Sequence, residues 1–187
     1  MKSFSEFIKE NKKTQLPEIY LDMDGVLADW LKGANSVLEK FGYPEWRDDS
    51  WKQLDNEQRD EIRWSILKKQ DKFWKNLPYM KEGKKLWRFL KPYKPHILSS
   101  VEERMKETAI PEKKEWLSEN LGLNNINRLH MVKHFTKNMY AVNENNEPNV
   151  LIDDYDVNCK MFEEAGGIAI KFESAEQVIK ELKKLGF

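Results

Sequence analysis

Two aspartates, two residues apart, are the strongest chemical signal in this chain. Asp22 and Asp24 directly follow the apolar run 19–21, which predicts a short buried strand. Two carboxylates at the end of a buried strand repel each other, and burying either as an ion is costly unless a cation or hydrogen bonds compensate. Mg2+ prefers oxygen ligands and would compensate both. The alternative is an aspartate-rich turn in which Gly25 supplies unusual backbone angles.

The rest of the chain predicts an α/β fold, a Rossmann-like parallel sheet flanked by helices. After the first strand, further strands are expected over 96–98, 129–132, 149–152 and 168–171. Helices are expected over 84–90, 111–120, 157–165 and 175–185, the second of them closed by Gly122. This alternation of strand and helix indicates a parallel sheet with helices on both faces.

A helical cap is expected between the first strand and the rest of the sheet. Residues 30–83 contain no convincing alternating strand and break at 42–44, at Pro78 and at Gly83. We therefore divide the chain into an N-terminal extension (1–18), a catalytic core (19–29 and 84–187) and the cap (30–83). The cap is rich in aromatic residues, namely Trp30, Trp46, Trp51, Trp64, Phe73 and Trp74.

Polar residues follow several predicted strands at the point where each strand ends. The carboxyl ends of parallel strands share one edge of the sheet, where ligands bind, so these residues are expected to meet. Taken singly, the serines could cap a helix, the later aspartates could form a turn, and any lysine could be a solvated surface group. The residues are Asp22 and Asp24, then Ser99 and Ser100, then Lys133 or Lys137, and finally Asp153 and Asp154.

The string 22–29, Asp-Met-Asp-Gly-Val-Leu-Ala-Asp, resembles the first motif of the haloacid-dehalogenase-like (HAD) phosphatases, and specifically their 5'(3')-deoxyribonucleotidase branch. Segments 151–155 and 165–168 resemble the fourth motif and following turn of bacterial and phage members, although the polar stretch 142–148 departs from the family pattern. Segment 136–141 resembles the third motif, which favours Lys137 over Lys133. Phe73-Trp74-Lys75-Asn76-Leu77-Pro78 and Lys113-x-x-Trp116 are also similar to this branch.

The resemblance implies a nucleophile, an acid–base group and a metal. Asp22 would attack the phosphorus of a phosphate monoester and form an aspartyl-phosphate. Asp24 would protonate the leaving oxygen and then accept a proton from the attacking water. Mg2+ would be held by Asp22, the backbone carbonyl of Asp24 and Asp154, with Asp153 orienting the catalytic lysine or a metal-bound water.

The resemblance also implies where the substrate binds. Lys137 and Ser99, with Ser100 beside it, would hold the phosphoryl oxygens. Trp30, eight residues after the nucleophile, would stack on a nucleotide base, as an aromatic residue does in the nucleotidase branch. Phe73 and Trp74 are weaker candidates for the same pocket. The cap aromatics other than Trp30 have the alternative role of packing the cap's own core.

Composition limits the remaining possibilities. The chain has 187 residues, enough for one substantial core with a small inserted subdomain. Lys plus Arg and Asp plus Glu each total 32, which excludes a global basic field of the kind that binds nucleic acids or membrane surfaces. Cys159 is the single cysteine, and no apolar stretch approaches the length of a membrane span or signal peptide. We expect a soluble cytoplasmic protein of a reducing compartment.

The first ten residues resemble the capsid-targeting leader of proteins packaged in the heads of T4-like phages. In such leaders cleavage follows an apolar-x-Glu triplet, which Ile8-Lys9-Glu10 matches. The resemblance implies a phage protein in the host cytoplasm, or inside the virion. An ordinary amphipathic terminus, with Phe4, Phe7 and Ile8 at helical spacing, is the alternative.

These observations predict a Mg2+-dependent phosphatase of nucleoside monophosphates, with deoxy forms preferred by resemblance alone. The expected partner is this small-molecule substrate. Nucleic acid and membrane are not expected, and a homodimer is left open. One alternative is a HAD phosphatase of another monoester, such as the terminal phosphate of a nucleic acid. A second is a non-catalytic phage internal or phosphate-binding protein that kept the fold.

Overall fold

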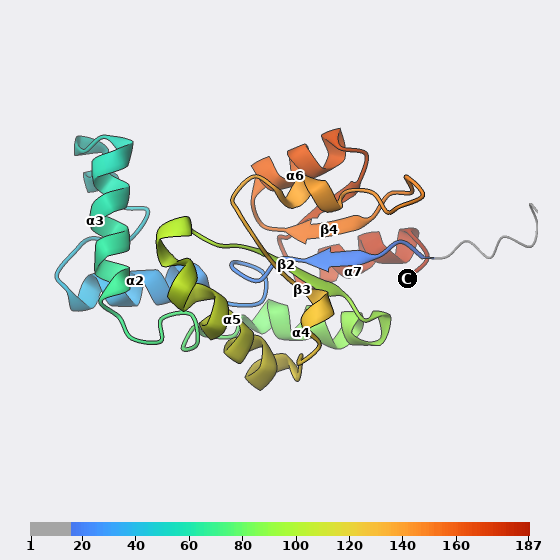
Figure 1. Ribbon diagram of the computed structural model, residues 1–187, viewed down its shortest axis with the longest axis horizontal. Helices are drawn as coiled ribbons and strands as arrows, with labels where there is room; N and C mark the ends of the chain where they lie inside the picture. Colours follow the sequence, from blue (N-terminus) through green and yellow to red (C-terminus); the bar gives the residue numbers. More distant parts are fainter. Residues whose placement is uncertain (1–15) are drawn as a thin grey trace, which may run out of the picture.

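The computed structural model describes residues 16–187, and a five-stranded parallel sheet forms its centre (Figure 1). The strands are β1 (Ile19–Leu21), β2 (His96–Ser100), β3 (Leu129–Val132), β4 (Val150–Asp153) and β5 (Ile168–Lys171), in the order β3-β2-β1-β4-β5. Tyr20 of β1 pairs with His96 on one side and with Leu151 on the other. The strand that leads into Asp22 therefore lies in the middle of the sheet, as the α/β prediction requires. The leader-like segment 1–10 lies outside the described residues.

The described part of the chain contains six α-helices besides the sheet. They are α2 (Trp30–Lys40), α3 (Asn56–Lys68), α4 (Lys81–Leu90), α5 (Lys106–Leu121), α6 (Asp156–Glu164) and α7 (Ala175–Lys184). Short 3-10 turns join them, namely η1 (Asp49–Gln53), η2 (Lys91–Tyr93), η3 (Glu103–Met105), η4 (Ile126–Arg128) and η5 (Lys137–Tyr140). None of the helices within 16–187 combines the length and apolar character needed to cross a bilayer.

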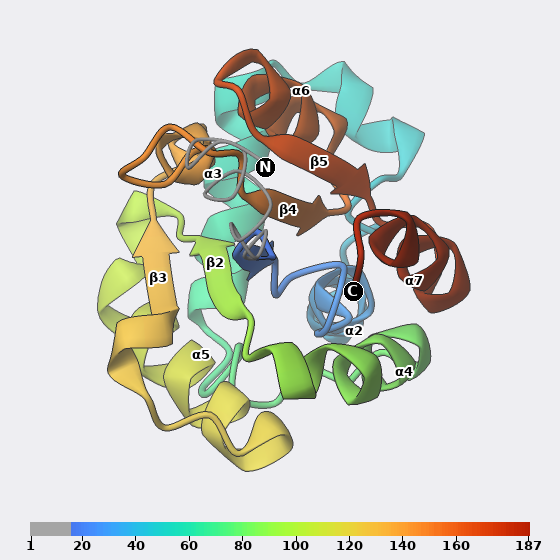
Figure 2. The same cartoon turned by 90° about the vertical axis from the view of Figure 1, so that its right-hand side faces the viewer.

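The two faces of the sheet pack against different helices, as Figure 2 shows. Ile19 and Leu21 point to one face and belong to a large buried cluster to which α4, α5 and α7 contribute. Tyr20 points to the other face and joins a smaller cluster with Phe162 of α6. This alternation follows from the two-residue period of a strand, and it puts helices on both faces.

The cap leaves the core and returns to it through adjacent positions. The Asp29 N–H donates to the carbonyl of Pro78 at 2.8 Å, and the Met80 N–H donates to the carbonyl of Leu27 at 2.8 Å. Between these crossings, α2 and α3 extend beyond the carboxyl ends of the strands (Figure 1). Apolar side chains of α3, such as Leu67, belong to the same buried cluster as the sheet. Packing against the core therefore stabilises the cap.

Two predicted helix boundaries were wrong. Gly83 does not break the chain but lies inside α4, where an added Cβ would come within 2.5 Å of the carbonyl oxygen of Val26. Glycine is needed there because α4 lies close to the backbone of Val26 and Leu27, in the loop that follows β1. Helix α5 starts at Lys106 and not near Pro111, which lies inside it. The turn before Pro111 is helical because Ala109, fully buried, packs into the large cluster.

Candidate active site

Three of the predicted aspartates come together where β1 and β4 end. One carboxylate oxygen each from Asp22, Asp153 and Asp154 lies within 4.8 Å of the others. The Asp22 N–H donates to the carbonyl of Ile152 at 2.9 Å, which holds the two strand ends side by side. Gly25 has φ of +84°, and a Cβ there would lie 2.3 Å from the Asp154 carboxylate. The loop therefore leaves room for Asp154 among a set of hard oxygen donors, which fits Mg2+.

Burial makes this carboxylate cluster electrostatically unfavourable by itself. Desolvation raises the pKa of Asp22 to about 8, the nearby Lys137 opposes the rise, and Asp153 adds to it. Desolvation likewise raises the pKa of Asp154 to about 6, and the charge of Asp153 adds to this shift. Both shifts come first from burial and then from the crowding of like charges. A divalent cation among these oxygens would favour their ionised forms.

Lys137 reaches the carboxylates from η5. Its Nζ lies 2.7 Å from Asp22 Oδ1 and 2.6 Å from Asp153 Oδ2, and the side chain is 2 % exposed. Burial alone would lower the pKa of this ammonium, but Asp22 and Asp153 raise it. Lys133, the other lysine considered from the sequence, is exposed. The structure therefore brings Lys137, and not Lys133, to Asp22.

Asp153 is held by a hydrogen-bond network of its own. It is fully buried, and besides Lys137 it accepts hydrogen bonds from the Tyr155 N–H at 2.9 Å and from Asn158 Nδ2 at 3.0 Å. Asn158 lies on the first turns of α6 and was not identified from the sequence. These bonds leave Asp153 suited to positioning Lys137, whereas Asp154 is partly exposed and faces the loop at Gly25.

A second buried lysine, Lys113 of α5, contacts the other half of the site. Its Nζ donates to Asp24 Oδ2 at 2.5 Å, to Ser99 Oγ at 2.8 Å and to the carbonyl of Ser100 at 2.9 Å. Lys113 belongs to the segment Lys113-x-x-Trp116 that resembles the deoxyribonucleotidase branch, but the sequence alone indicates no role for it. A signal was present, because Lys113 lies four residues after Ala109 and four before Leu117, on the buried stripe of the helix.

Two buried polar atoms next to Lys113 have no hydrogen-bond partner among the described residues. They are Asp24 Oδ1 and the hydroxyl oxygen of Ser100. Buried polar groups are normally satisfied, so unpaired ones concentrated beside charged residues indicate a place where a polar ligand binds. Ser99, Ser100 and Asp24 thus lie together as the strand-end argument predicted.

The predicted base-binding aromatics are not equally available. Trp30, at the start of α2, is partly buried, and its ring centroid lies 4.7 Å from that of Trp46 and 5.9 Å from that of Trp64. Phe73 and Trp74 are each 3 % exposed and belong to the large buried cluster. Their packing matches the alternative role in the cap core, and a role in substrate binding stays a prediction for all three.

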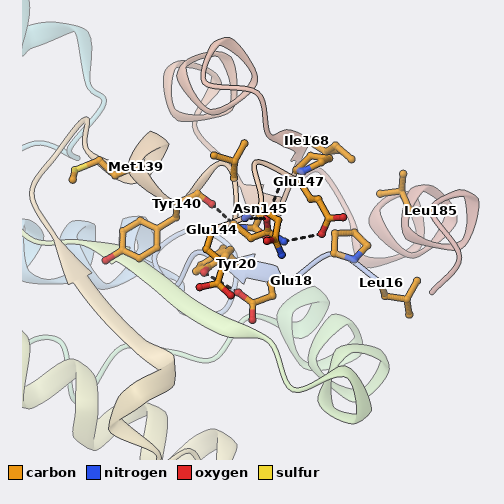
Figure 3. Close-up of a pocket in the computed structure, with 15 residues that line it drawn as sticks. Leu16, Glu18, Tyr20, Met139, Tyr140, Glu144, Asn145, Glu147, Ile168 and Leu185 are labelled. Carbon is orange, nitrogen blue, oxygen red and sulfur yellow. Dashed lines mark hydrogen bonds between the residues drawn. The ribbon is translucent and has the colours of Figure 1, made fainter. Parts of the chain in front are cut away.

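A large hollow lies at the opposite edge of the sheet, where β1, β4 and β5 begin (Figure 3). Its volume is about 1110 Å3, and Tyr20, Tyr140, Asn143, Glu147 and Ile168 are among the residues that line it. None of the clustered aspartates lines it. The size of this hollow does not mark the chemistry, because ligands of parallel α/β sheets bind at the carboxyl ends of the strands.

Comparison with known proteins identifies the fold. No family model and no curated protein matches the chain. Among solved structures it is similar to a putative β-phosphoglucomutase from Thermotoga maritima, with a TM-score of 0.53, 13% identity and coverage of 90% of this chain and 99% of that one. It is also similar to L-2-haloacid dehalogenase from Xanthobacter autotrophicus, with a TM-score of 0.53, 14% identity and coverage of 92% and 84%. A predicted phosphatase from Clostridium acetobutylicum gives a TM-score of 0.52, 13% identity and coverage of 91% and 100%.

The fold is therefore the α/β fold of the HAD-like hydrolases. Its carboxyl edge carries the aspartates, serines and lysine that the sequence motifs predicted for such a site.

Proposed function

We propose that this chain is a Mg2+-dependent phosphatase that hydrolyses nucleoside monophosphates through an aspartyl-phosphate intermediate. The observation that carries the proposal is the meeting of Asp22, Lys137 and Asp154 at one edge of the sheet. A phosphate ester is an anion, so a carboxylate can attack it only where positive charge is concentrated. Lys137 supplies one such charge, and the aspartate trio supplies oxygen ligands for a divalent cation.

The reaction would proceed in two displacements. A carboxylate oxygen of Asp22 forms a bond to phosphorus, the bond from phosphorus to the alcohol oxygen breaks, and Asp24 gives its proton to that oxygen. Asp24 then takes a proton from water, whose oxygen bonds to phosphorus as the aspartyl–phosphorus bond breaks and inorganic phosphate leaves. Lys137 and the Ser99 hydroxyl would hold the phosphoryl oxygens throughout.

Asp22, the backbone carbonyl of Asp24 and Asp154 would hold Mg2+. Bound there, the ion would supply Lewis-acid charge that lets an anionic carboxylate approach an anionic phosphate. The unpaired Asp24 Oδ1 lies next to this set and is free to exchange a proton with the leaving oxygen.

Nucleotides are the proposed substrates because the insertion that carries Trp30 extends beyond the carboxyl edge of the sheet (Figure 1). Trp30 lies at the start of α2, eight residues after Asp22 in the sequence, and in this proposal its indole contacts the base of a nucleotide whose phosphate is held at Asp22. Stacking on a base suits an indole and tolerates any base. The preference for deoxynucleotides rests on the sequence resemblance alone.

The test is phosphate release in the presence of Mg2+ from a panel of esters. The panel contains 5'- and 3'-nucleoside and deoxynucleoside monophosphates, sugar phosphates, p-nitrophenyl phosphate and a 3'-phosphorylated DNA oligomer. We expect release from nucleotides to exceed that from the generic ester, and EDTA to stop it. Preference for the oligomer or a sugar phosphate would overturn the substrate assignment, and no release from any ester would overturn the phosphatase assignment.

A further inference from the structure

Lys113 carries one of the two buried ammonium groups of the site, and it comes from a helix instead of a strand end. The side chain is 1 % exposed, and its three hydrogen bonds reach the loop after β1 and the end of β2. An ammonium group has three protons, so these bonds use all of its donors. Burying a charge is costly, and the three bonds are what make this position tolerable.

Two neighbours fix the position of Lys113 along α5. Trp116 Nε1 donates to the carbonyl of Leu77 at 2.8 Å, and Glu112 Oε2 accepts a hydrogen bond from the Trp74 N–H at 2.9 Å. Both bonds tie α5 to the segment through which the cap returns to the core. Lys113 therefore reaches Asp24 from a helix anchored on either side of it, which preorganises the contact.

The bonds of Lys113 leave specific atoms free. Because Lys113 occupies Asp24 Oδ2, only Oδ1 of that carboxylate remains, and Oδ1 has no partner among the described residues. Because Lys113 donates to Ser99 Oγ, the hydroxyl proton of Ser99 must point to another acceptor. The free carboxylate oxygen and the free hydroxyl proton are the two groups that an incoming phosphate ester needs.

Formal charge also requires Lys113. Four carboxylates, those of Asp22, Asp24, Asp153 and Asp154, face the ammonium groups of Lys113 and Lys137. With all four ionised, one divalent cation would make the site neutral before the substrate arrives, and Asp24 Oδ1 would take up the proton that it later gives to the leaving oxygen when the substrate binds. Without Lys113 the same site would carry a net negative charge and would repel a phosphate dianion.

We propose that Lys113 is a positioning residue for phosphate-ester hydrolysis. It aims Asp24 Oδ1 at the leaving oxygen and the Ser99 hydroxyl at a phosphoryl oxygen, and it balances the charge of the aspartates. This inference rests on the proposed function. It adds a helix-borne lysine to the four strand-end motifs.

The deciding experiment compares Lys113→Met, Lys113→Gln and the control Lys114→Met on two substrates. A nucleotide has a poor leaving group that needs a proton, whereas p-nitrophenyl phosphate has a good one that does not. Loss of one fixed charge in such a site costs on the order of 100-fold in kcat, so we expect this loss for Lys113→Met on the nucleotide. The loss on p-nitrophenyl phosphate should be about tenfold smaller, because proton donation matters less there.

The control and a double variant separate positioning from folding. Lys114 is the partly exposed next residue of α5, and Lys114→Met should stay within about twofold of wild type on both esters. Lys113→Gln keeps a donor but no charge and should fall between Met and wild type. The double variant Lys113→Met with Ser99→Ala should lose less activity than the product of the two single losses. Each single change already removes the hydrogen bond between Lys113 and Ser99, so the second change has less left to remove. Equal losses on both esters, or multiplicative losses, would overturn the proposal.

Binding of inorganic phosphate distinguishes this inference from the proposed function. With Mg2+ present, calorimetry should show about tenfold weaker phosphate binding to Lys113→Met than to wild type, since one unit of charge is missing. Wild type that releases phosphate from no ester would refute the proposed function, and the binding comparison would still decide whether Lys113 organises a phosphate site. Equal binding by wild type and Lys113→Met would refute the inference.

Discussion

The two edges of the sheet both hold polar clusters, but of different character. At the carboxyl edge, buried carboxylates and ammonium groups pair at 2.5 to 2.7 Å. At the amino edge, the polar side chains are only partly buried: His96 Nδ1 and His130 Nε2 share a hydrogen bond at 2.9 Å, and the Tyr20 hydroxyl donates to the exposed Glu18 at 3.2 Å. The amino edge also has the hollow shown in Figure 3.

Buried charge, and not empty volume, therefore marks the candidate active site. A partly exposed polar cluster costs little, because water can satisfy its groups, so it needs no function to explain it. Charges crowded in a buried site are costly and persist where a ligand or a reaction uses them. Substitutions at the carboxyl edge should therefore change turnover, and substitutions at the amino edge should change stability alone.

The largest effect is expected from Asp22→Asn. An amide is neither a nucleophile nor an anionic ligand, so turnover should fall on the order of 10,000-fold or more, while the nearly isosteric change preserves the fold. Steady-state phosphate release and a thermal melt measure the two quantities. Asp156→Asn, an exposed aspartate at the start of α6, is the control and should keep wild-type turnover. Substantial activity in Asp22→Asn would exclude the covalent mechanism.

Asp153 and Asp154 should respond differently, although they are adjacent. Asp154→Asn removes a metal ligand and should raise the Mg2+ concentration for half-maximal activity by about 100-fold or more. Asp153→Asn should raise it less but lower the free energy of unfolding by about 3 kcal/mol, because Asp153 is fully buried and binds Lys137. Mg2+ titration and denaturant unfolding check these effects. The reverse ranking in the Mg2+ titration would exchange the two roles.

Trp30→Ala should cost less and only on some substrates. If the indole stacks on a base, its loss should weaken transition-state binding of nucleotides by about 1–3 kcal/mol, measured from the fall in kcat/KM. The value on p-nitrophenyl phosphate should change little. The control is Trp51→Ala, which removes a buried cap tryptophan that packs on Arg63. Trp51→Ala should lower stability without changing the ratio of the two substrates. A Trp30→Ala variant that behaves like this control would make Trp30 a cap-core residue.

The last effects concern pH, and they act on stability with signs that differ between the edges. Burial raises the pKa of Asp22 from its usual 3.8 to about 8, so the metal-free folded state binds more protons than the unfolded state, and stability falls as pH rises towards 8. Burial lowers the pKa of His96 and His130 below 6.5, so stability falls as pH drops below 6.5. Saturating Mg2+ should abolish the first trend, and His130→Phe should weaken the second with unchanged turnover. Denaturant unfolding from pH 5 to 8 tests both.

Much of the site could be predicted because strand ends are visible in a sequence. The apolar run before Asp22 predicted β1, and the five strands of the structure lie where the sequence indicated, with β2 extending through Ser100. Lys113 was missed because a lysine on a helix is normally solvated, and only its place on a buried stripe distinguished it. The start of α4 was missed because Gly83 breaks helices by propensity, whereas here its close contact with Val26 decides. Local pattern cannot show such contacts between distant segments.

The central place of β1 has a consequence for biosynthesis. The strand that leads into Asp22 is translated before both of its partners in the sheet. Tyr20 of β1 pairs with His96 of β2 and with Leu151 of β4, which follow much later in the sequence. Closing such long loops is slow, and domains emerge from the ribosome from the N-terminus. The strand that leads into Asp22 must therefore stay unpaired on one side until β4 has been translated. In a nascent chain stalled before β4, Asp22 and Asp24 would be present but Asp153 and Asp154 would not. The apolar strand β1 would also have one unpaired edge, and such edges promote aggregation.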